Sequence, residues 1–159
     1  MVSKQEYEIK NLMKVLVGNN IKLFEKFIEE NGINCVEIKD KRNLLMYCII
    51  QKKNDFAKKT IELGINLNHQ DAIGYSALHF TVQENNLEIL ELLLKSKATV
   101  DIIDKNGNTP LWRAAFIQNK IDKKIIELLI NAGADINKIN NHGIAPKKFI
   151  ENLVSGIDN

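Results

Sequence analysis

The sequence DAIGYSALH at Asp71–His79 returns 33 residues later as DKNGNTPLW at Asp104–Trp112. At the same interval before Ser76–Val82, small and apolar residues occupy the same positions in NLLMYCI at Asn43–Ile49. A fixed period of this length predicts stacked copies of one supersecondary unit rather than a single closed domain. Such arrays bind along an exposed face and seldom enclose a catalytic pocket.

Each unit is predicted to contain a turn, a short helix and a second, amphipathic helix. The turn lies at Gly74 in one unit and at Gly107 in the next. Thr109 suits the N-cap of the first helix, and Pro110 suits its first helical position, where the missing N–H costs nothing. Apolar residues at helical spacing across Leu87–Leu94 predict the second helix.

The second helix follows a tight turn at Asn85–Asn86, and Gly133 suits the left-handed residue that ends it. The helix at Ile125–Ile130 lies 36 rather than 33 residues after its counterpart at Ile89–Leu94. This unit therefore has three extra residues, which we place within Gln118–Lys123.

Composition is that of an ordinary folded protein, with 45% apolar residues in a chain of 159. No apolar run approaches the ~20 residues that a membrane span needs, and the polar start at Met1–Glu8 predicts no signal peptide. Cys35 and Cys48 stand apart from each other and from any His cluster. We therefore expect two buried thiols in a reducing, cytoplasmic environment and no membrane partner.

The charge is nearly balanced, with 22 basic and 20 acidic residues. Nucleic-acid binding usually concentrates positive charge on one face and interleaves it with aromatic residues for stacking. The lysine pairs instead fit ordinary solvated helix faces, so we expect no nucleic-acid partner. Lysine outnumbers arginine twenty to two, which is typical of AT-rich coding sequence and favours a low-GC bacterial source.

GNTPLWRAA at Gly107–Ala115 and LLINAGADIN at Leu128–Asn137 resemble an ankyrin repeat, and the resemblance covers nearly the whole chain. It implies an all-α solenoid of the small stand-alone bacterial type, with one domain over residues 1–159. Within that domain the resemblance implies a degenerate N-terminal cap at 1–37, repeats at 38–70, 71–103 and 104–139, and a C-terminal cap at 140–159. The C-terminal cap is indicated by Lys147 and Lys148, which stand where the family has Leu and His.

No residue pattern predicts catalysis. The resemblance makes His79 a structural residue that bonds neighbouring backbone, while His69 and His142 are expected in exposed loops without metal-ligand spacing. No nucleophile has an identifiable base partner, and the chain has no phosphate-binding glycine motif. We therefore predict that the protein is not an enzyme and needs no cofactor and no metal.

The resemblance implies binding of a partner protein, on the hairpin tips and on the concave face made by the first helices. We expect a monomer. Trp112 is expected to pack between repeats rather than to contact the partner. Phe116 and Ile117 either face the partner or pack beneath the 118–123 loop. The residues predicted to bind the partner combine aromatic, apolar and cationic groups; they are Lys39, Arg42, Ile73, Tyr75, Lys105, Asn108, Phe116 and Ile144.

Two biological roles follow from the resemblance. The protein is either a scaffold or regulator, or an immunity protein that binds and blocks a toxin or enzyme encoded beside it. A toxin-like reading frame next to the gene would favour the immunity role. Nucleic-acid binding and catalysis are distant alternatives; the first predicts steep salt dependence of binding and the second a deep polar pocket.

Overall fold

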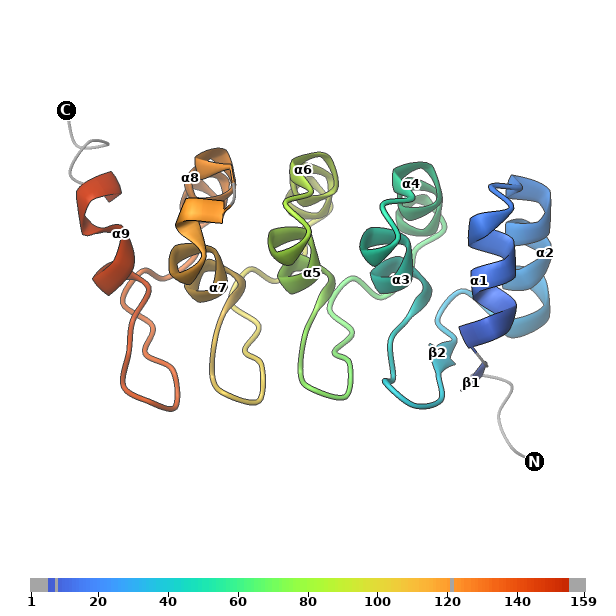
Figure 1. Cartoon of the computed structure of the whole chain (residues 1–159), viewed down its shortest axis with the longest axis horizontal. Coiled ribbons are helices and arrows are strands. Elements are labelled where there is room, and N and C mark those ends of the chain that lie inside the picture. The colour runs from blue at the N-terminus through green and yellow to red at the C-terminus, as the bar shows by residue number, and fades with distance from the viewer. Residues whose placement is uncertain (1–5, 8, 121, 155–159) are drawn as a thin grey trace.

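The computed structural model describes residues 6–7, 9–120 and 122–154, and it stacks pairs of helices side by side in one row (Figure 1). The predictions that concern residues 1–5, 8, 121 and 155–159 lie outside the described residues. Loops between successive pairs project from one edge of the row. The helices are α1 (Ile9–Val17), α2 (Ile21–Asn31), α3 (Leu44–Ile50), α4 (Asn54–Glu62), α5 (Ala77–Gln83), α6 (Leu87–Lys95), α7 (Pro110–Phe116), α8 (Lys123–Asn131) and α9 (Lys147–Val154), with a short 3₁₀ segment, η1 (Gln118–Lys120), before α8.

This arrangement confirms the all-α solenoid and adds one small element to it. Strand β1 (Glu6–Tyr7) pairs in parallel with β2 (Val36–Glu37), with Glu6 opposite Val36. The pair joins the start of the described chain to the loop that precedes α3. Two residues carry no readable period-2 pattern, so the sequence could not indicate these strands.

Helix starts follow the predicted capping chemistry. Thr109 is the N-cap of α7, its side chain accepts a hydrogen bond from the Trp112 amide, and Pro110 is the first helical residue. Asn43 and Asn86 cap α3 and α6 in the same way through their side-chain oxygens. Each cap satisfies an amide that has no partner within its helix, so unit boundaries are set locally.

Turns between and after the helices use left-handed backbone at equivalent positions. Asn85 has φ +51° in the tight turn predicted before α6, and Gly133 has φ +91° after α8, as expected. At the end of α6, Lys97 has φ +66° where the neighbouring units carry Gly64 and Gly133. A residue with a β-carbon is strained in this region, so Lys97 carries a local cost that the other two units avoid.

Lys97→Gly is therefore expected to stabilise the protein by about 0.5–1 kcal/mol, after the greater freedom of glycine in the unfolded chain is subtracted. Urea unfolding followed by circular dichroism measures the change. Lys95→Gly, two residues earlier at the last residue of α6, is the matched control and should destabilise, because glycine weakens a helix. Equal effects of both substitutions would contradict this explanation.

One continuous core runs from Leu12 to Ile150 through every helix pair. Leu45, Leu78 and Leu111 occupy the same position in successive units, and each is at most 1% exposed. Burial of each leucine contributes about 2 kcal/mol, and the helices pack both on the second helix of their own unit and on the first helix of the next, as α3 does on α4 and α5. At the equivalent position of the last unit, Lys147 is exposed, as its charge requires.

Candidate functional site

Three hairpin loops are each organised by one side-chain oxygen atom of a buried residue, and the loop before α3 uses the carboxylate of Glu37 instead. Oδ1 of Asp71 accepts hydrogen bonds from the amides of Ile73 at 3.0 Å and Tyr75 at 2.9 Å. Asp104 and Asn140 accept the corresponding two bonds in the next two loops. Because the oxygen satisfies two amides of the turn at once, the predicted tip residues stand on a fixed backbone.

Neighbouring loops are also bonded to each other. The amide at each tip donates to a carbonyl in the preceding loop, so the loops form one continuous layer along the row. A partner would therefore meet a surface that is already ordered, with little conformational entropy left to lose. The bonds are Ala72 N to Asp40 O at 2.7 Å, Lys105 N to Ile73 O at 3.1 Å, and Asn141 N to Asn106 O at 2.9 Å.

Arg42 is held between two units. Its Nε donates to Oδ2 of Asp71 at 3.2 Å, and its Nη1 lies 3.3 Å from Oδ2 of Asp40. The guanidinium also lies 5.2 Å above the Phe80 ring and 5.9 Å above the Tyr47 ring. Only 26% of the side chain is exposed. A partner that uses Arg42, as predicted, would touch its edge rather than draw it out of these contacts.

Tyr75 is likewise half-buried rather than free at a tip. Its ring stacks on His79 at 4.9 Å and meets Phe80 edge-on at 5.5 Å. Arg113 lies 5.8 Å above the same ring and donates to Gln83 at 3.3 Å. Burial raises the pKa of the Tyr75 hydroxyl, so the ring remains neutral at physiological pH.

His79 has the structural role that the resemblance implied. Its Nδ1 accepts from the Ser76 amide at 3.1 Å, so the ring proton lies on Nε2, which donates to the Asn108 carbonyl at 3.1 Å. One unit later, the Nε1–H of Trp112 donates to the Ile144 carbonyl at 3.1 Å. Trp112 therefore repeats the bond of the histidine with a group that does not titrate.

The pH dependence of stability is expected to reflect His79. Burial lowers the pKa of its imidazole below the usual value of about 6.5. The unfolded chain then binds the proton more readily than the folded one, so stability is full above about pH 6.5 and falls as pH drops below it. His79→Gln should flatten this slope in urea unfolding between about pH 7.5 and about pH 5.5. His142→Gln at an exposed tip is the control, and an unchanged slope in His79→Gln would contradict the assignment.

The structure separates the eight predicted binding residues into two groups. Ile73 is 50% exposed and Phe116 is 57% exposed, while Ile117 is half-buried against the core. Phe116 is therefore not covered by the following loop, whereas Ile117 packs against the core. The exposed predicted residues are Lys39, Ile73, Lys105 and Phe116, and the half-buried ones are Arg42, Tyr75, Asn108 and Ile144.

Trp112, Phe116 and Phe149 form a set of three rings that we call the aromatic cluster. Trp112 and Phe116 stack at 5.2 Å with planes 12° apart, and Phe149 meets them edge-on at 5.9 and 5.7 Å. The Gln118 side chain donates to the Phe149 carbonyl. Trp112 thus packs between units, as predicted. Phe149 is not among the residues predicted from the sequence, although its position, equivalent to that of Arg113 one unit earlier, could have indicated it.

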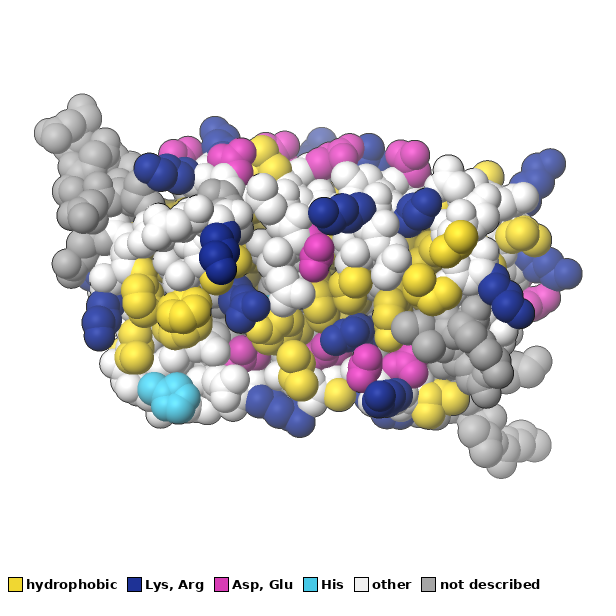
Figure 2. Space-filling view, in the orientation of Figure 1, with side chains coloured by type: hydrophobic (Ala, Val, Ile, Leu, Met, Phe, Trp, Pro, Cys, Tyr) yellow, Lys and Arg dark blue, Asp and Glu magenta, His cyan; other side chains and the backbone are white. Residues whose placement is uncertain are grey.

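Apolar side chains lie in a band across the face that the first helices and the loops present. Figure 2 shows this band in yellow between the loop edge and the opposite edge of the row, interrupted by charged groups. Contiguous apolar groups on an exposed surface mark interaction sites more often than single ones do. The band is the candidate site.

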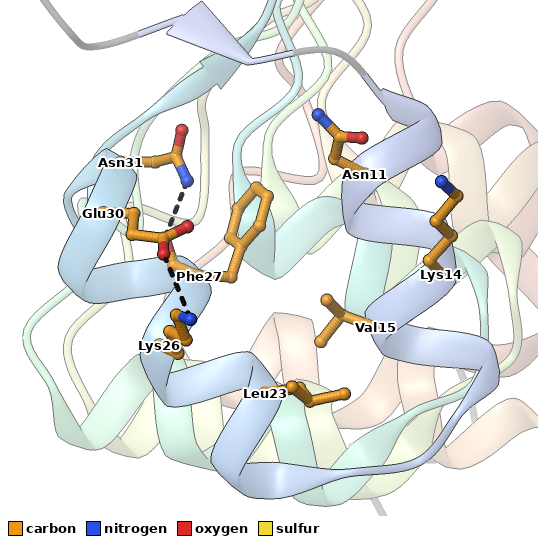
Figure 3. Close-up of a pocket in the computed structure, with 8 residues that line it drawn as sticks. All are labelled: Asn11, Lys14, Val15, Leu23, Lys26, Phe27, Glu30 and Asn31. Carbon is orange, nitrogen blue, oxygen red and sulfur yellow. Dashed lines mark hydrogen bonds and ion pairs between the residues drawn. The ribbon is translucent and has the colours of Figure 1, made fainter.

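A hollow of about 380 Å³ lies between α1 and α2, at the other end of the array (Figure 3). Val15, Leu23 and Phe27 project between the two helices in this view. Lys26 and Glu30 pair across 3.8 Å on the rim with both side chains more than half exposed, so the pair contributes little stability. None of the predicted binding residues lines this hollow.

Within the described residues, no group of three or more His, Cys, Asp or Glu side chains could hold a metal ion. Cys35 and Cys48 are buried, as predicted, and they are not bonded to each other. Burial raises the pKa of the Cys35 thiol to about 12 and raises that of Cys48 as well. Both thiols stay protonated at neutral pH, so neither is a reactive nucleophile.

Comparison with known proteins identifies the repeat. A family model described as ankyrin repeats in three copies matches residues 12–103 and 45–140. An ankyrin repeat protein of Borreliella burgdorferi is 30% identical over 69% of this chain and 52% of its own length. One from Acanthamoeba polyphaga mimivirus is 36% identical over 45% of this chain and 10% of its own length. Human neurogenic locus notch homolog protein 2 is 32% identical over 56% of this chain and 4% of its own length.

These relatives come from a bacterium, a virus and a mammal, so they do not identify the source of this chain. The chain spans about half the Borreliella protein and much less of the other two. No helix of the described residues has the length and apolar character that a membrane crossing requires. The family match covers most of the chain, and it agrees with the stacked helix pairs, the bonded hairpin loops and the N-caps of the helices. This chain belongs to the ankyrin repeat family.

Proposed function

We propose that this chain binds a partner protein through the face formed by its hairpin tips and the first helices α3, α5 and α7. Ankyrin repeats are in general protein–protein interaction modules. In this proposal the chain acts as a monomer and by binding alone, without chemistry of its own.

The observation that carries the proposal is the exposure of Phe116 and Ile73 on that face. They are 57% and 50% exposed although water favours polar groups at such positions. Both belong to rigid elements, since Phe116 stacks on Trp112 and the Ile73 amide is fixed by Asp71. Large, pre-ordered apolar groups of this kind provide most of the affinity at protein interfaces.

The face is also large enough for a specific complex. A standard interface buries roughly 800 Å² on each partner, which three adjacent repeat units can supply. Arg42 and Tyr75 are half-buried residues of the hairpin loops and contribute polar edges to the face. An apolar centre with arginine and aromatic neighbours has the composition typical of binding sites.

The test is affinity purification with the immobilised chain, mass spectrometry of what it retains, and titration of the purified partner. Ile73→Ser and Phe116→Ser should each weaken binding about tenfold or more, because each removes an apolar anchor. Leu63→Ser, at the end of α4 and 45% exposed, is the matched control and should leave affinity within about twofold.

The proposal fails if Leu63→Ser weakens binding as much as the other two, because the contact surface would then lie elsewhere. A retained nucleic acid, with binding that falls steeply as salt rises, would favour the nucleic-acid alternative. Sedimentation velocity of the free chain tests the proposal that it is a monomer.

A further inference from the structure

We propose that the aromatic cluster of Trp112, Phe116 and Phe149 binds an acidic protein segment that carries a large apolar side chain. This inference rests on the proposed function and adds the part of the face that carries the affinity and the chemistry of the partner.

The cluster offers a rigid apolar anchor. Phe116 keeps 57% of its surface exposed even though Trp112 stacks on one side and Phe149 meets it edge-on. The Trp112 N–H is already bonded to the Ile144 carbonyl, so a partner that covers the rings leaves no indole donor unsatisfied. The Gln118 bond to the Phe149 carbonyl holds α9 beside the segment that follows α7. Rings fixed in this way lose little conformational entropy on binding.

Positive charge surrounds the cluster. Arg113 comes from α7, Lys120 from η1, and Lys147 and Lys148 from the first turn of α9. The three lysines are exposed. Figure 2 shows dark blue side chains on both flanks of the yellow patch at the C-terminal end of the row. The exposed lysines therefore come from η1 and α9, whereas the Arg113 guanidinium is held over Tyr75.

Apart from Glu151 of α9, the acidic residues in the same part of the chain belong to other elements. Residues 104–120 and 122–150 contain eight basic and four acidic residues, although the whole chain carries only +2. Asp104 is buried beneath its own loop. The other three acidic residues belong to α8 or to its two ends, and they are Asp122, Glu127 and Asp135. This local excess of basic residues does not appear in the net charge of the whole chain, because residues 61–103 contain two basic and six acidic residues.

This charge pattern decides between ligands that aromatic rings can bind. Three rings could hold a cation such as a methylated lysine, but the surrounding lysines would repel it. A neutral proline-rich segment could stack on the rings and would leave the lysines without a role. An acidic segment with a leucine or phenylalanine uses both features, because its carboxylates meet the lysines while its apolar side chain covers Phe116.

In the experiment, peptides that bind the intact, immobilised chain are selected from a phage-displayed library of random peptides of about 12 residues. Peptides that also bind Phe116→Ser are removed. We expect the enriched peptides to carry net negative charge and at least one large apolar residue. Trp112 is the only tryptophan of the chain, so a tryptophan-free peptide that covers the cluster should change its fluorescence saturably.

Charge variants give the matched comparison. Lys147→Glu with Lys148→Glu should weaken the enriched peptides about fivefold, because it reverses charge beside the rings. Lys123→Glu with Lys124→Glu makes the same change at exposed positions of α8 and should alter affinity less than about twofold. Peptide anisotropy, which does not depend on Trp112, checks the affinities of all variants.

The inference is overturned if the enriched peptides are neutral or basic, if both lysine pairs matter equally, or if no peptide depends on Phe116. Binding that depends on Ile73 and not on Phe116 would overturn this inference and leave the proposed function standing. Partner binding that ignores Ile73 and Phe116 but depends on Leu63 would overturn both.

Discussion

Gly74→Ala is expected to destabilise the protein by about 2–4 kcal/mol, which would be among the largest effects of any single-methyl addition in this chain. A β-carbon at this position would lie 2.9 Å from the Cα of Asp104 and 2.9 Å from the amide nitrogen of Lys105. Both atoms belong to the backbone of the next loop, which cannot move without breaking the Lys105–Ile73 bond. The left-handed φ of +85° adds a further cost for any residue with a side chain.

Gly143→Ala separates these two costs. Gly143 also has left-handed backbone, at φ +70°, but a β-carbon there would meet nothing within 4 Å. Its cost should be the conformational part alone, about 1 kcal/mol. Equal losses at Gly74 and Gly143 would show that close packing of neighbouring loops contributes nothing.

Gly74→Ala should also reduce cooperativity, because the clash falls between the unit at 71–103 and the unit at 104–139. Trp112 lies beyond that boundary and reports on the C-terminal part of the array, while circular dichroism reports on all helices. In urea, the two probes should coincide for the wild type and separate for Gly74→Ala, with fluorescence changing first. Coincident curves for the variant would mean that the units on the two sides of the boundary still unfold together.

Asp71→Asn is expected to cost about 2 kcal/mol, the second large effect. Asparagine keeps the oxygen that accepts from Ile73 and Tyr75. It replaces Oδ2, however, with an amide that faces the Nε donor of Arg42, so a charge-assisted bond becomes two opposed donors. The Asp71 side chain is almost completely buried, whereas Arg42 is 26% exposed, which keeps the loss below that of a fully buried ion pair.

Asp104→Asn is the control, because the second oxygen of Asp104 accepts from the neutral amide of Asn108. Asparagine already occupies the same position at Asn140 and makes the same two loop bonds. The control should cost less than about 1 kcal/mol. A double-mutant cycle of Asp71→Asn with Arg42→Met should give a coupling of about 1–2 kcal/mol, and a coupling near zero would refute the proposed origin of the loss.

The repeat pattern predicted the local structure well. Helices, caps and left-handed turns depend on residues close in sequence, so Thr109, Pro110 and Gly133 predicted local structure correctly. Lys41 shows the limit of the pattern. It stands where other loops carry glycine, yet its φ of +56° keeps the same turn, because Glu37 supplies the carboxylate that bonds the loop amides.

Candidate binding residues were harder to predict because exposure depends on which residues of the next unit cover them. Ile73 is exposed, and so is Phe116, for which the sequence left exposure and packing beneath the next loop open. Arg42 and Tyr75 occupy equally suitable positions, but Phe80 and Asp71 from the next unit cover the arginine, and Arg113 covers the tyrosine. A contact between side chains of two units cannot be recognised in the sequence of either unit alone.

The sequence by itself determined the period, the family and the helix caps, because each depends on a pattern that recurs in successive units, and the family resemblance implied the structural role of His79. Only the tertiary structure decided that Trp112, Phe116 and Phe149 share one cluster and that positive charge frames it. Those residues come from two units and lie as much as 37 positions apart. Stacking brings them together, and the contacts that stacking creates are visible only after the chain has folded.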